Sequence, residues 1–412
     1  MGGKAVKLSE RKPPKTERSR EKIDLPRPTN GYYEAISERF GIAQMILYLL
    51  LLAFVVASLL SNTGMITYQN LYYFIKDLNA SAETVDVLHS DSLSYPADTS
   101  QSFALYRKGL AVAGSSSVTV FTATGREAIS LHVQYQNPVA IGSGKYLMVY
   151  ELGGTQYSLY NSYTKIYSGK TQAPIRGAEM SQNGMYAIIT GGSEHASVVD
   201  LYNSDFKQNG RYSYNGYVTD VGINEKGNRL AVLISEEQGA AFSTSLRIYE
   251  TEKSEPSARV LIGDGLGLTC AFTSSGGITV LSTNGLSHVK SDGGVTLLRA
   301  FDADMLTYAD LNADGGAIVL RKNEKLSENE IVAFDKNGKM LYNGTVGKTV
   351  ESVALNGNVL FLKEKQGILR IDPRTNARTE HSCSTDGKTL LCIDEHRVLL
   401  CSAQKAVSYT LS

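Results

Sequence analysis

Asp310, Asn312, Asp314 and Gly315 match the D-x-[DN]-x-[DN]-G pattern that begins many calcium-binding loops. Oxygen atoms at alternate positions of such a loop surround the ion, and a bidentate Glu at the twelfth position completes the site. The twelfth position here is Arg321, a cation. The same residues form a polar turn ending in Gly between two apolar stretches, so we expect a plain turn and no metal site.

Other motifs for catalysis or cofactor binding are incomplete. The pair Gly144-Lys145 resembles the end of a phosphate-binding loop, but Val139 stands at the first glycine position and Tyr146 at the Ser/Thr position. The six histidines lack zinc-ligand spacing, and no Gly-x-Ser-x-Gly sequence is present. Carboxylate pairs from distant parts of the chain cannot be recognised in sequence. We therefore expect a protein that is not an enzyme and has no cofactor.

The four cysteines leave two interpretations open. None of Cys270, Cys383, Cys392 and Cys401 lies in a C-x-x-C pair. Cys392 and Cys401 flank a turn and share parity for one sheet face, which would permit a disulfide among the last three cysteines in an oxidising compartment. We favour the other interpretation, in which the cysteines are small buried apolar residues.

Tyrosine is the residue type whose distribution could mean binding. The chain has 24 tyrosines and no tryptophan, and tyrosine is dense between Tyr146 and Tyr217. Exposed tyrosines make good contacts with proteins or sugars, because the ring is apolar and the hydroxyl polar. The alternative is that tyrosines fill strand positions in a core without tryptophan. The predicted binding face consists of Tyr157, Tyr160, Tyr163, Tyr167, Tyr212, Tyr214 and Tyr217.

The elements that would position these residues are short strands. From residue 84 onward, stretches of alternating polarity are separated by clusters of Gly, Asn, Asp and Ser, which is typical of strands joined by tight turns. One unit recurs, in which an apolar strand and a polar turn ending in Gly precede a second apolar strand. It occurs at 180–187, 223–230, 272–276, 311–315 and 355–357, with weaker copies at Gly109, Gly144 and Gly387.

The spacing of these turns predicts a β-propeller. The eight glycines follow one another at intervals of 30 to 49 residues, close to the roughly 40–45 residues of a four-stranded blade. We predict an all-β propeller of about eight blades, with seven as the alternative. The last copy is short, and a strand from the start of the domain, such as Thr84–His89, would complete that blade and close the ring.

An uncharged run from Ile42 to Leu60 precedes the repeats. As a helix it would extend roughly 28 Å, close to the hydrocarbon thickness of a bilayer. Residues 1–40 hold ten Lys/Arg and six acidic residues, and no Lys or Arg follows Arg39 until Lys76, so the positive-inside rule places the N-terminus in the cytoplasm. A cleaved signal peptide ending near Ala57 is the alternative, although the head before the run is long for one.

The predicted organisation has four parts. Residues 1–40 form a disordered basic cytoplasmic head, 41–62 a transmembrane helix, 63–83 an amphipathic juxtamembrane segment, and 84–412 an extracytoplasmic propeller. Residues 41–412 carry 31 basic and 35 acidic residues, which argues against nucleic acid as a partner.

This organisation resembles a family of uncharacterised single-pass, membrane-anchored proteins of Gram-positive bacteria that carry a domain of unknown function. The shared features are the basic head, the apolar run, the aromatic residues from Tyr68 to Phe74 and the glycine turns. The resemblance implies a WD40-like propeller outside the membrane, and it supplies no activity and no functional residues. The chain lacks the Trp-Asp dipeptide of true WD40 repeats and the tryptophans of quinoprotein propellers.

Three functions are compatible with this architecture. The first is a protein-binding or scaffold module at the cell envelope, because a propeller offers a broad rigid rim. The second is a sensor that binds cell-wall or extracellular glycan through the tyrosines. The third is a glycan-cleaving enzyme with carboxylates in the central channel. We favour the first, since no catalytic motif is recognisable.

Overall fold

The computed structural model describes residues 39–53, 92–239, 241–323, 328–383, 386–387 and 389–411. The chain divides into two units, residues 1–72 and 73–412. In the first unit the described residues form one helix over 39–53, with every side chain exposed. This helix contains the start of the predicted span. The remainder of that span, most of the predicted head and the predicted juxtamembrane segment lie outside the described residues. No helix in the described part of the chain is long and apolar enough to cross a membrane.

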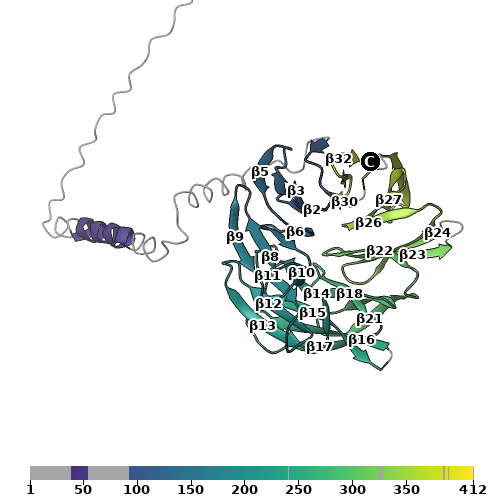
Figure 1. Ribbon diagram of the computed structural model, residues 1–412, viewed down its shortest axis with the longest axis horizontal. Coiled ribbons are helices and arrows are strands. Elements are labelled where there is room, and N and C mark those ends of the chain that lie inside the picture. Colours follow the sequence, from purple (N-terminus) through teal and green to yellow (C-terminus); the bar gives the residue numbers. More distant parts are fainter. Residues whose placement is uncertain are drawn as a thin grey trace, which may run out of the picture. The chain divides into compact units, whose positions relative to one another are not determined.

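The second unit consists of antiparallel β-sheet. Its described strands form eight sheets of four strands each, arranged around a central axis (Figure 1). The first strand of each sheet contacts the first strand of the next, so these first strands surround the axis. The predicted eight-bladed propeller is confirmed, and the seven-bladed alternative is wrong.

The first four blades follow one another along the chain. Blade 1 contains β2 (Gln101–Tyr106), β3 (Gly109–Gly114), β4 (Ser117–Phe121) and β5 (Glu127–His132), and blade 2 contains β6 (Pro138–Gly142), β7 (Leu147–Glu151), β8 (Gln156–Tyr160) and β9 (Lys165–Lys170). Blade 3 contains β10 (Ile175–Met180), β11 (Tyr186–Thr190), β12 (Ser197–Tyr202) and β13 (Gln208–Tyr214), and blade 4 contains β14 (Tyr217–Ile223), β15 (Arg229–Gln238), β16 (Ala241–Glu250) and β17 (Ala258–Asp264).

The remaining blades continue the same order. Blade 5 contains β18 (Gly267–Phe272), β19 (Ile278–Ser282), β20 (Gly285–Val289) and β21 (Val295–Ala300), and blade 6 contains β22 (Leu306–Asn312), β23 (Gly315–Asn323), β24 (Glu328–Asp335) and β25 (Met340–Val346). Blade 7 contains β26 (Val350–Asn356), β27 (Val359–Glu364), β28 (Gly367–Asp372) and β29 (Ala377–Ser382), and blade 8 contains β30 (Thr389–Cys392), β31 (Arg397–Cys401), β32 (Lys405–Thr410) and β1 (Ser92–Ser94).

Strand composition follows position within the blade. Every residue of β27 and β28, the two middle strands of blade 7, is buried, whereas the outer strand β29 is mostly exposed. A middle strand is covered on both faces by neighbouring blades, so apolar residues predominate in it. The charged residues of these two strands, Lys363, Glu364, Arg370 and Asp372, are buried as well. An outer strand faces water along its edge and over much of its surface, and it tolerates polar residues.

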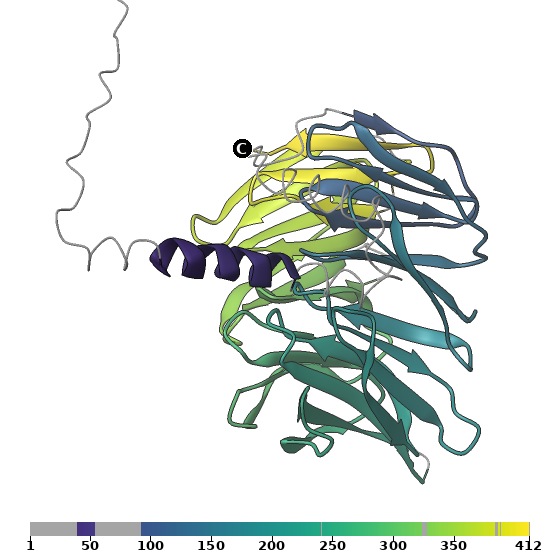
Figure 2. The same cartoon turned by 90° about the vertical axis from the view of Figure 1, so that its left-hand side faces the viewer.

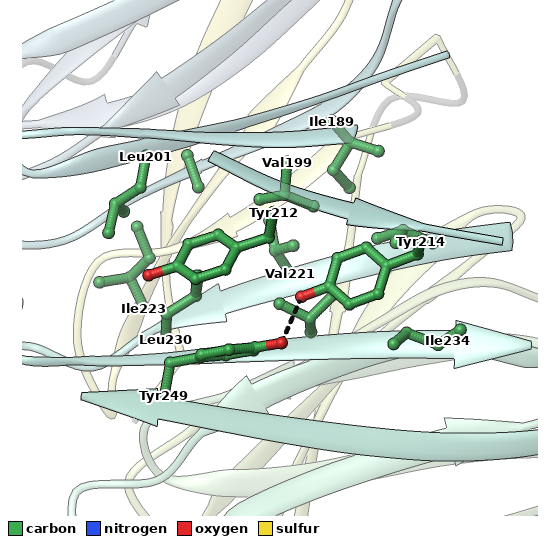
Figure 3. Packing of buried hydrophobic residues seen from close by; sticks show 13 residues of the cluster. Ile189, Val199, Leu201, Tyr212, Tyr214, Val221, Ile223, Leu230, Ile234 and Tyr249 are labelled. Carbon is green, nitrogen blue, oxygen red and sulfur yellow. Dashed lines mark hydrogen bonds between the residues drawn. The ribbon is translucent and has the colours of Figure 1, made fainter. Parts of the chain in front are cut away.

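Tyrosines fill much of the space between blades 3 and 4 (Figure 3). Tyr212 and Tyr214 from β13 and Tyr249 from β16 pack with aliphatic residues such as Val199 and Leu230. The Tyr212 and Tyr249 ring centroids are 4.5 Å apart, and the Tyr214 hydroxyl donates to that of Tyr249 at 2.8 Å. Each of these rings buries a large apolar area, and this hydrogen bond satisfies two hydroxyls in the interior.

The ring closes by pairing the two ends of the domain. Strand β1 lies antiparallel to β32, with Leu93 opposite Ala406. Leu93 also packs with Leu110 of blade 1 and Leu399 of blade 8, and both views show the yellow strands of blade 8 beside the blue strands of blade 1 (Figures 1 and 2). Closure by an N-terminal strand is therefore as predicted, but β1 makes it. The predicted segment Thr84–His89 lies outside the described residues.

The glycine turns join the first and second strands of the blades. Five of them place their glycine at positive φ, where a side chain would be strained: Gly184, Gly227, Gly276, Gly315 and Gly357. Gly109 is required for a different reason: a Cβ at this position would lie 2.0 Å from the carbonyl oxygen of Phe121. In that turn Arg107 and Lys108 have positive φ instead.

The eighth predicted turn was assigned to the wrong glycine. Gly387 precedes β30, so it lies in the link between blades 7 and 8. The corresponding turn of blade 8 runs over residues 393–396 and contains no glycine. Its Asp394 side chain accepts the backbone N–H groups of His396 and Arg397, at 2.8 Å each, and stabilises the turn in place of glycine.

Candidate functional site

Two adjoining hollows open between blades 1 and 2. Their volumes are about 520 and 430 Å³, and they share the lining residues His132, Val133, Gln134, Tyr135 and Gln156. We call the two hollows together the blade 1–2 groove. It begins at the link end of the propeller, where the connections between blades lie, and continues along the outer strand β9.

The floor of the groove is a polar patch on blade 2. Gln156 and Ser158 of β8 lie opposite Lys170 and Ser168 of β9, so these four side chains share one face of the sheet. That face is turned toward blade 1, because the hydroxyl of Tyr135, from the link after β5, lies 3.0 Å from Ser158 Oγ. Ser158 and Ser168 are also joined, with their Oγ atoms 3.3 Å apart.

The hollow exists because these side chains are small. Ser158 lies two residues before Tyr160, which fills the core between blades 1 and 2, and Ser168 is the partner of Ser158 in β9. In blade 4 the corresponding residues are Arg247, two residues before Tyr249, and its partner Arg259 in β17. The Arg247 guanidinium there lies 5.6 Å from the ring centroid of Tyr214 and occupies the interface. Serines in place of arginines leave the equivalent space in blade 2 open.

Buried tyrosines make part of the lining without offering a ring face. Tyr135 and Tyr157 are only 7% and 2% exposed, and burial raises the pKa of both hydroxyls. Both therefore remain protonated at neutral pH. The Tyr135 hydroxyl is hydrogen-bonded to the groove floor, whereas the Tyr157 ring points to the other face of β8 and packs with Tyr186 of blade 3. Gly169 is required beside Tyr157, because a Cβ there would lie 2.3 Å from the Tyr157 ring.

The rim of the groove is basic at β9 and at the end of β5. His132, Lys165 and Lys170 are exposed, and neither lysine forms an ion pair with another residue of the described ranges. Glu151, on the opposite side, accepts a hydrogen bond from the backbone N–H of Gln136 at 3.0 Å. The groove thus combines free cations with hydroxyl and amide groups.

The predicted tyrosine face is divided between the core and the surface. Tyr157, Tyr160, Tyr212 and Tyr214 are buried, Tyr163 and Tyr167 are half-buried, and Tyr217 is 46% exposed. The structure does not gather the seven rings on one surface, and Tyr157 is the member that lines the groove. Ligand binding by the less buried members stays a prediction.

The calcium-like motif forms a turn that holds blade 6 to blade 7. Asp310 Oδ2 accepts the N–H of Leu355 at 2.8 Å, and Asp314 Oδ2 accepts the N–H of Gly357 at 2.8 Å. Asn312 Nδ2 donates to Asp310 at 3.0 Å and to the Leu355 carbonyl at 2.8 Å. Burial raises the pKa of Asp310 to about 6. These oxygens are therefore engaged in hydrogen bonds across the blade interface, and the predicted turn is confirmed.

Two further carboxylates lie on the first strands of blades 3 and 4. Burial, reinforced by the negative charge of Asp220, raises the pKa of Glu179 to about 8. Asp220 accepts hydrogen bonds from Thr269 Oγ1 at 2.7 Å and from the N–H of Cys270 at 2.9 Å. Glu179 is therefore a proton donor at neutral pH, whereas Asp220 fastens blade 4 to blade 5. No cluster of three potential metal-binding side chains was found in the described ranges.

The cysteines are free thiols. The expectation that Cys392 and Cys401 share one sheet face is wrong, because Cys392 packs toward blade 7 with Val398, whereas Cys401 packs toward blade 1 with Leu399. Three positions separate Val398, the partner of Cys392, from Cys401, and an odd separation reverses the face. Burial raises the pKa of the Cys270, Cys392 and Cys401 thiols, as expected for apolar core residues.

The groove residues were not recognised in the sequence. Ser158 and Ser168 are ordinary strand serines until their register is known, and Lys165 and Lys170 have the pattern of a solvated strand face. The usable signal is a comparison between copies of the repeat, in which a pair of serines stands where blade 4 has Arg247 and Arg259. Making that comparison requires the strand pairing.

The fold and the groove define a closed eight-bladed β-propeller with a polar recess between its first two blades. The chain belongs to DUF5711, a family of unknown function whose model matches residues 81–411. No curated protein matches the chain in sequence.

Solved propellers resemble the chain in fold. Sqt1 of Chaetomium thermophilum, bound to the N-terminus of ribosomal protein L10, has a TM-score of 0.53 at 11% identity, over 77% of this chain and 98% of its own. BamB of Moraxella catarrhalis has a TM-score of 0.52 at 12% identity, over 78% and 98%. A eukaryotic initiation factor has a TM-score of 0.53 at 15% identity, over 75% and 84%. At these identities the likeness establishes the fold alone.

Proposed function

We propose that this chain is a membrane-anchored, extracytoplasmic propeller that binds another protein of the cell envelope through the blade 1–2 groove. The observation that carries the proposal is the groove itself, formed by adjoining hollows of about 520 and 430 Å³ between blades 1 and 2. Its hydroxyls, amides and free lysines are the groups that hold a polar segment of a partner. Nothing in this lining is arranged as a nucleophile and base.

The comparison with Sqt1 supports a protein ligand. That propeller is bound to the N-terminal segment of a ribosomal protein, so the architecture can hold a stretch of polypeptide. The present chain is only 11% identical to it, and the groove described above rests on this chain's own residues. The proposal therefore takes from the comparison only the kind of ligand.

The membrane placement rests on the sequence. The uncharged run from Ile42 to Leu60 and the excess of Lys and Arg before it support one span with a cytoplasmic N-terminus. The resemblance to anchored propellers of Gram-positive bacteria supports the same placement. Labelling intact cells with a membrane-impermeant lysine reagent tests it. The propeller lysines should react without permeabilisation, whereas Lys4 and Lys7 should react only after it.

Crosslinked co-purification of the full-length protein from its native membranes tests the binding function. We expect a stoichiometric protein partner that is lost when Gln134, exposed in the groove, is replaced by Trp, whose bulk fills the groove. The matched control is Gln182→Trp, on an exposed turn at the opposite end of the blades, which should retain the partner. Recovery of the protein without a partner, or equal recovery with both variants, would refute the groove as a protein-binding site.

A glycan ligand is the second candidate, because Tyr135 and Tyr157 line the groove. Sugar-binding sites commonly present aromatic ring faces to the ligand, and both of these rings are buried. Retention of the propeller on purified cell-wall polysaccharide, abolished by Gln134→Trp and unaffected by Gln182→Trp, would favour this candidate over the protein partner.

A further inference from the structure

We infer that the ligand of the blade 1–2 groove is an extended acidic segment of the partner protein that pairs along the free edge of β9. This inference rests on the proposed function, since it assigns the chemistry of the segment that the groove binds. It depends on three properties of blade 2, namely an open strand edge, cations on one face of that edge, and hydrogen-bonding groups below it.

The open edge is the outer side of β9. The strand order in blade 2 is β6-β7-β8-β9, so β9 pairs with β8 on one side and with no described strand on the other. An edge strand presents unpaired backbone N–H and C=O groups, to which an extended peptide can add as a further strand. The other outer strands are also edges, but the groove lies against this one.

A bulge places the cations of β9 on one face. Lys165 and Lys170 are five residues apart, and in a regular strand they would point to opposite faces. The register shifts between Leu159 and Tyr160, so Lys165 lies opposite Tyr160 while Lys170 lies opposite Gln156. Tyr160 and Gln156 share parity, and both ammonium groups are therefore on the face that borders the groove.

The charges around the groove favour an anion. His132 lies across from the two lysines, and the described residues provide neither lysine with an ion-pair partner. Glu151 is at the far end, where it accepts the backbone N–H of Gln136. Because of the bulge, Lys165 and Lys170 lie opposite residues of β8 that are four positions apart, which corresponds to about 13–14 Å along the strand. A paired strand would therefore place acidic side chains four residues apart beside them.

The groups between the lysines suit a peptide better than a sugar. Ser158, Ser168, Gln134 and Gln156 offer donors and acceptors for backbone amides and polar side chains. The neutral hydroxyl of Tyr135 adds one more such group. A sugar ring would find no exposed aromatic face on this floor, because the Tyr135 ring is buried.

The test places a benzophenone amino acid at Gln134 of the full-length protein in its native membranes. After irradiation, mass spectrometry identifies the crosslinked peptide. We expect a segment with several Asp or Glu and net negative charge. Its crosslinking should fall at least tenfold in Lys165→Glu/Lys170→Glu. The control Lys207→Glu/Lys226→Glu reverses two exposed lysines at the turn end and should leave crosslinking unchanged.

Pairing with β9 has its own readout. The crosslinked segment, synthesised as a peptide, should slow amide hydrogen exchange at residues 165–170 and leave the other outer strands unchanged. A thermal unfolding midpoint equal to that of the unsubstituted protein shows that the charge-reversed variants are folded, since all four lysines are exposed.

The outcomes separate this inference from the proposed function. A crosslink to a neutral or basic segment, or one that survives charge reversal, overturns the acidic ligand but leaves a protein-binding groove. An acidic segment without slowed exchange in β9 overturns the strand pairing. A crosslink to polysaccharide overturns the inference and the protein ligand in favour of the glycan candidate. No crosslink from Gln134, while a partner co-purifies through another surface, overturns both the inference and the groove.

Discussion

Glu179 is a carboxylic acid that the propeller keeps protonated at neutral pH. It lies half-buried in β10, enclosed by the first strands of the adjoining blades, and its pKa rises from 4.5 to about 8. Burial is the main cause, and the nearby charge of Asp220 adds to it. Burial also raises the pKa of Asp220, but its carboxylate accepts the N–H of Cys270 and the hydroxyl of Thr269, which oppose that rise. The two neighbouring carboxylates therefore differ in role.

The stability of the protein should depend on pH through this residue. Between about pH 4.5 and 8 the folded state holds a proton that the unfolded chain releases, so stability falls as pH rises across this window. Glu179→Gln removes the ionisable group. The variant should match the unsubstituted protein near pH 4 and exceed it by roughly 2–4 kcal/mol near pH 8, measured by urea unfolding.

Glu225→Gln supplies the control for Glu179→Gln, because Glu225 lies on an exposed turn. Glu225→Gln removes the same charge from the surface, so its free energy of unfolding should follow that of the unsubstituted protein from pH 4 to 8, whereas that of Glu179→Gln should not. A Glu179→Gln profile parallel to that of the unsubstituted protein from pH 4 to 8 would mean that Glu179 is ionised in the folded state.

Turn geometry acts at the scale of the element, and it connects the blades as well as the strands. Asn183 Nδ2 in the turn of blade 3 donates to the Lys226 carbonyl in that of blade 4 at 2.7 Å. Arg229 of blade 4 donates a hydrogen bond to the Gly276 carbonyl of blade 5 at 3.1 Å. The Ser274 N–H of blade 5 donates to the Ala313 carbonyl of blade 6 at 2.7 Å. The polar residues of the repeat thus join neighbouring blades around the turn end.

A matched pair of glycines tests the need for positive φ in these turns. An added Cβ would meet nothing within 4 Å at Gly276 or at Gly347, but Gly276 has a φ of 87° and Gly347 has no positive φ. Gly276→Ala should lower the free energy of unfolding by about 1–2 kcal/mol through backbone strain. Gly347→Ala should cause no loss. Equal urea midpoints for the two variants would contradict this account.

The elements were predictable from the sequence, and their partners were not. Strand, turn and glycine recur in the order that a blade requires, so the number of blades followed from the spacing. The turn of blade 8 was not recognised because Asp394 stabilises it in place of the glycine on which the sequence pattern depends. The groove was not predicted because Ser158 and Ser168 can be recognised as its floor only when β8 and β9 are paired and blade 1 is placed beside them.

At the scale of the whole molecule, closing the ring buries the faces at which its first and last blades meet. Closure was predictable, since the last blade had too few strands. The choice of β1 was not, because three residues around Leu93 show no distinctive pattern. Closure depends on contacts between the two ends of the domain, among them the hydrogen bond from the Tyr95 hydroxyl to the Ser402 carbonyl at 2.7 Å.

Ring closure predicts that one buried side chain in β1 affects the stability of the entire propeller. Leu93 is 3% exposed and contacts residues of blades 1 and 8, whereas Ser94, next to it, is exposed. Leu93→Asp places a carboxylate in that interface and should lower the free energy of unfolding by about 3 kcal/mol. Ser94→Asp adds the same charge outside the core and should change it by less than about 0.5 kcal/mol. Urea unfolding followed by tyrosine fluorescence measures both, and equal losses would mean that β1 does not hold the ring closed.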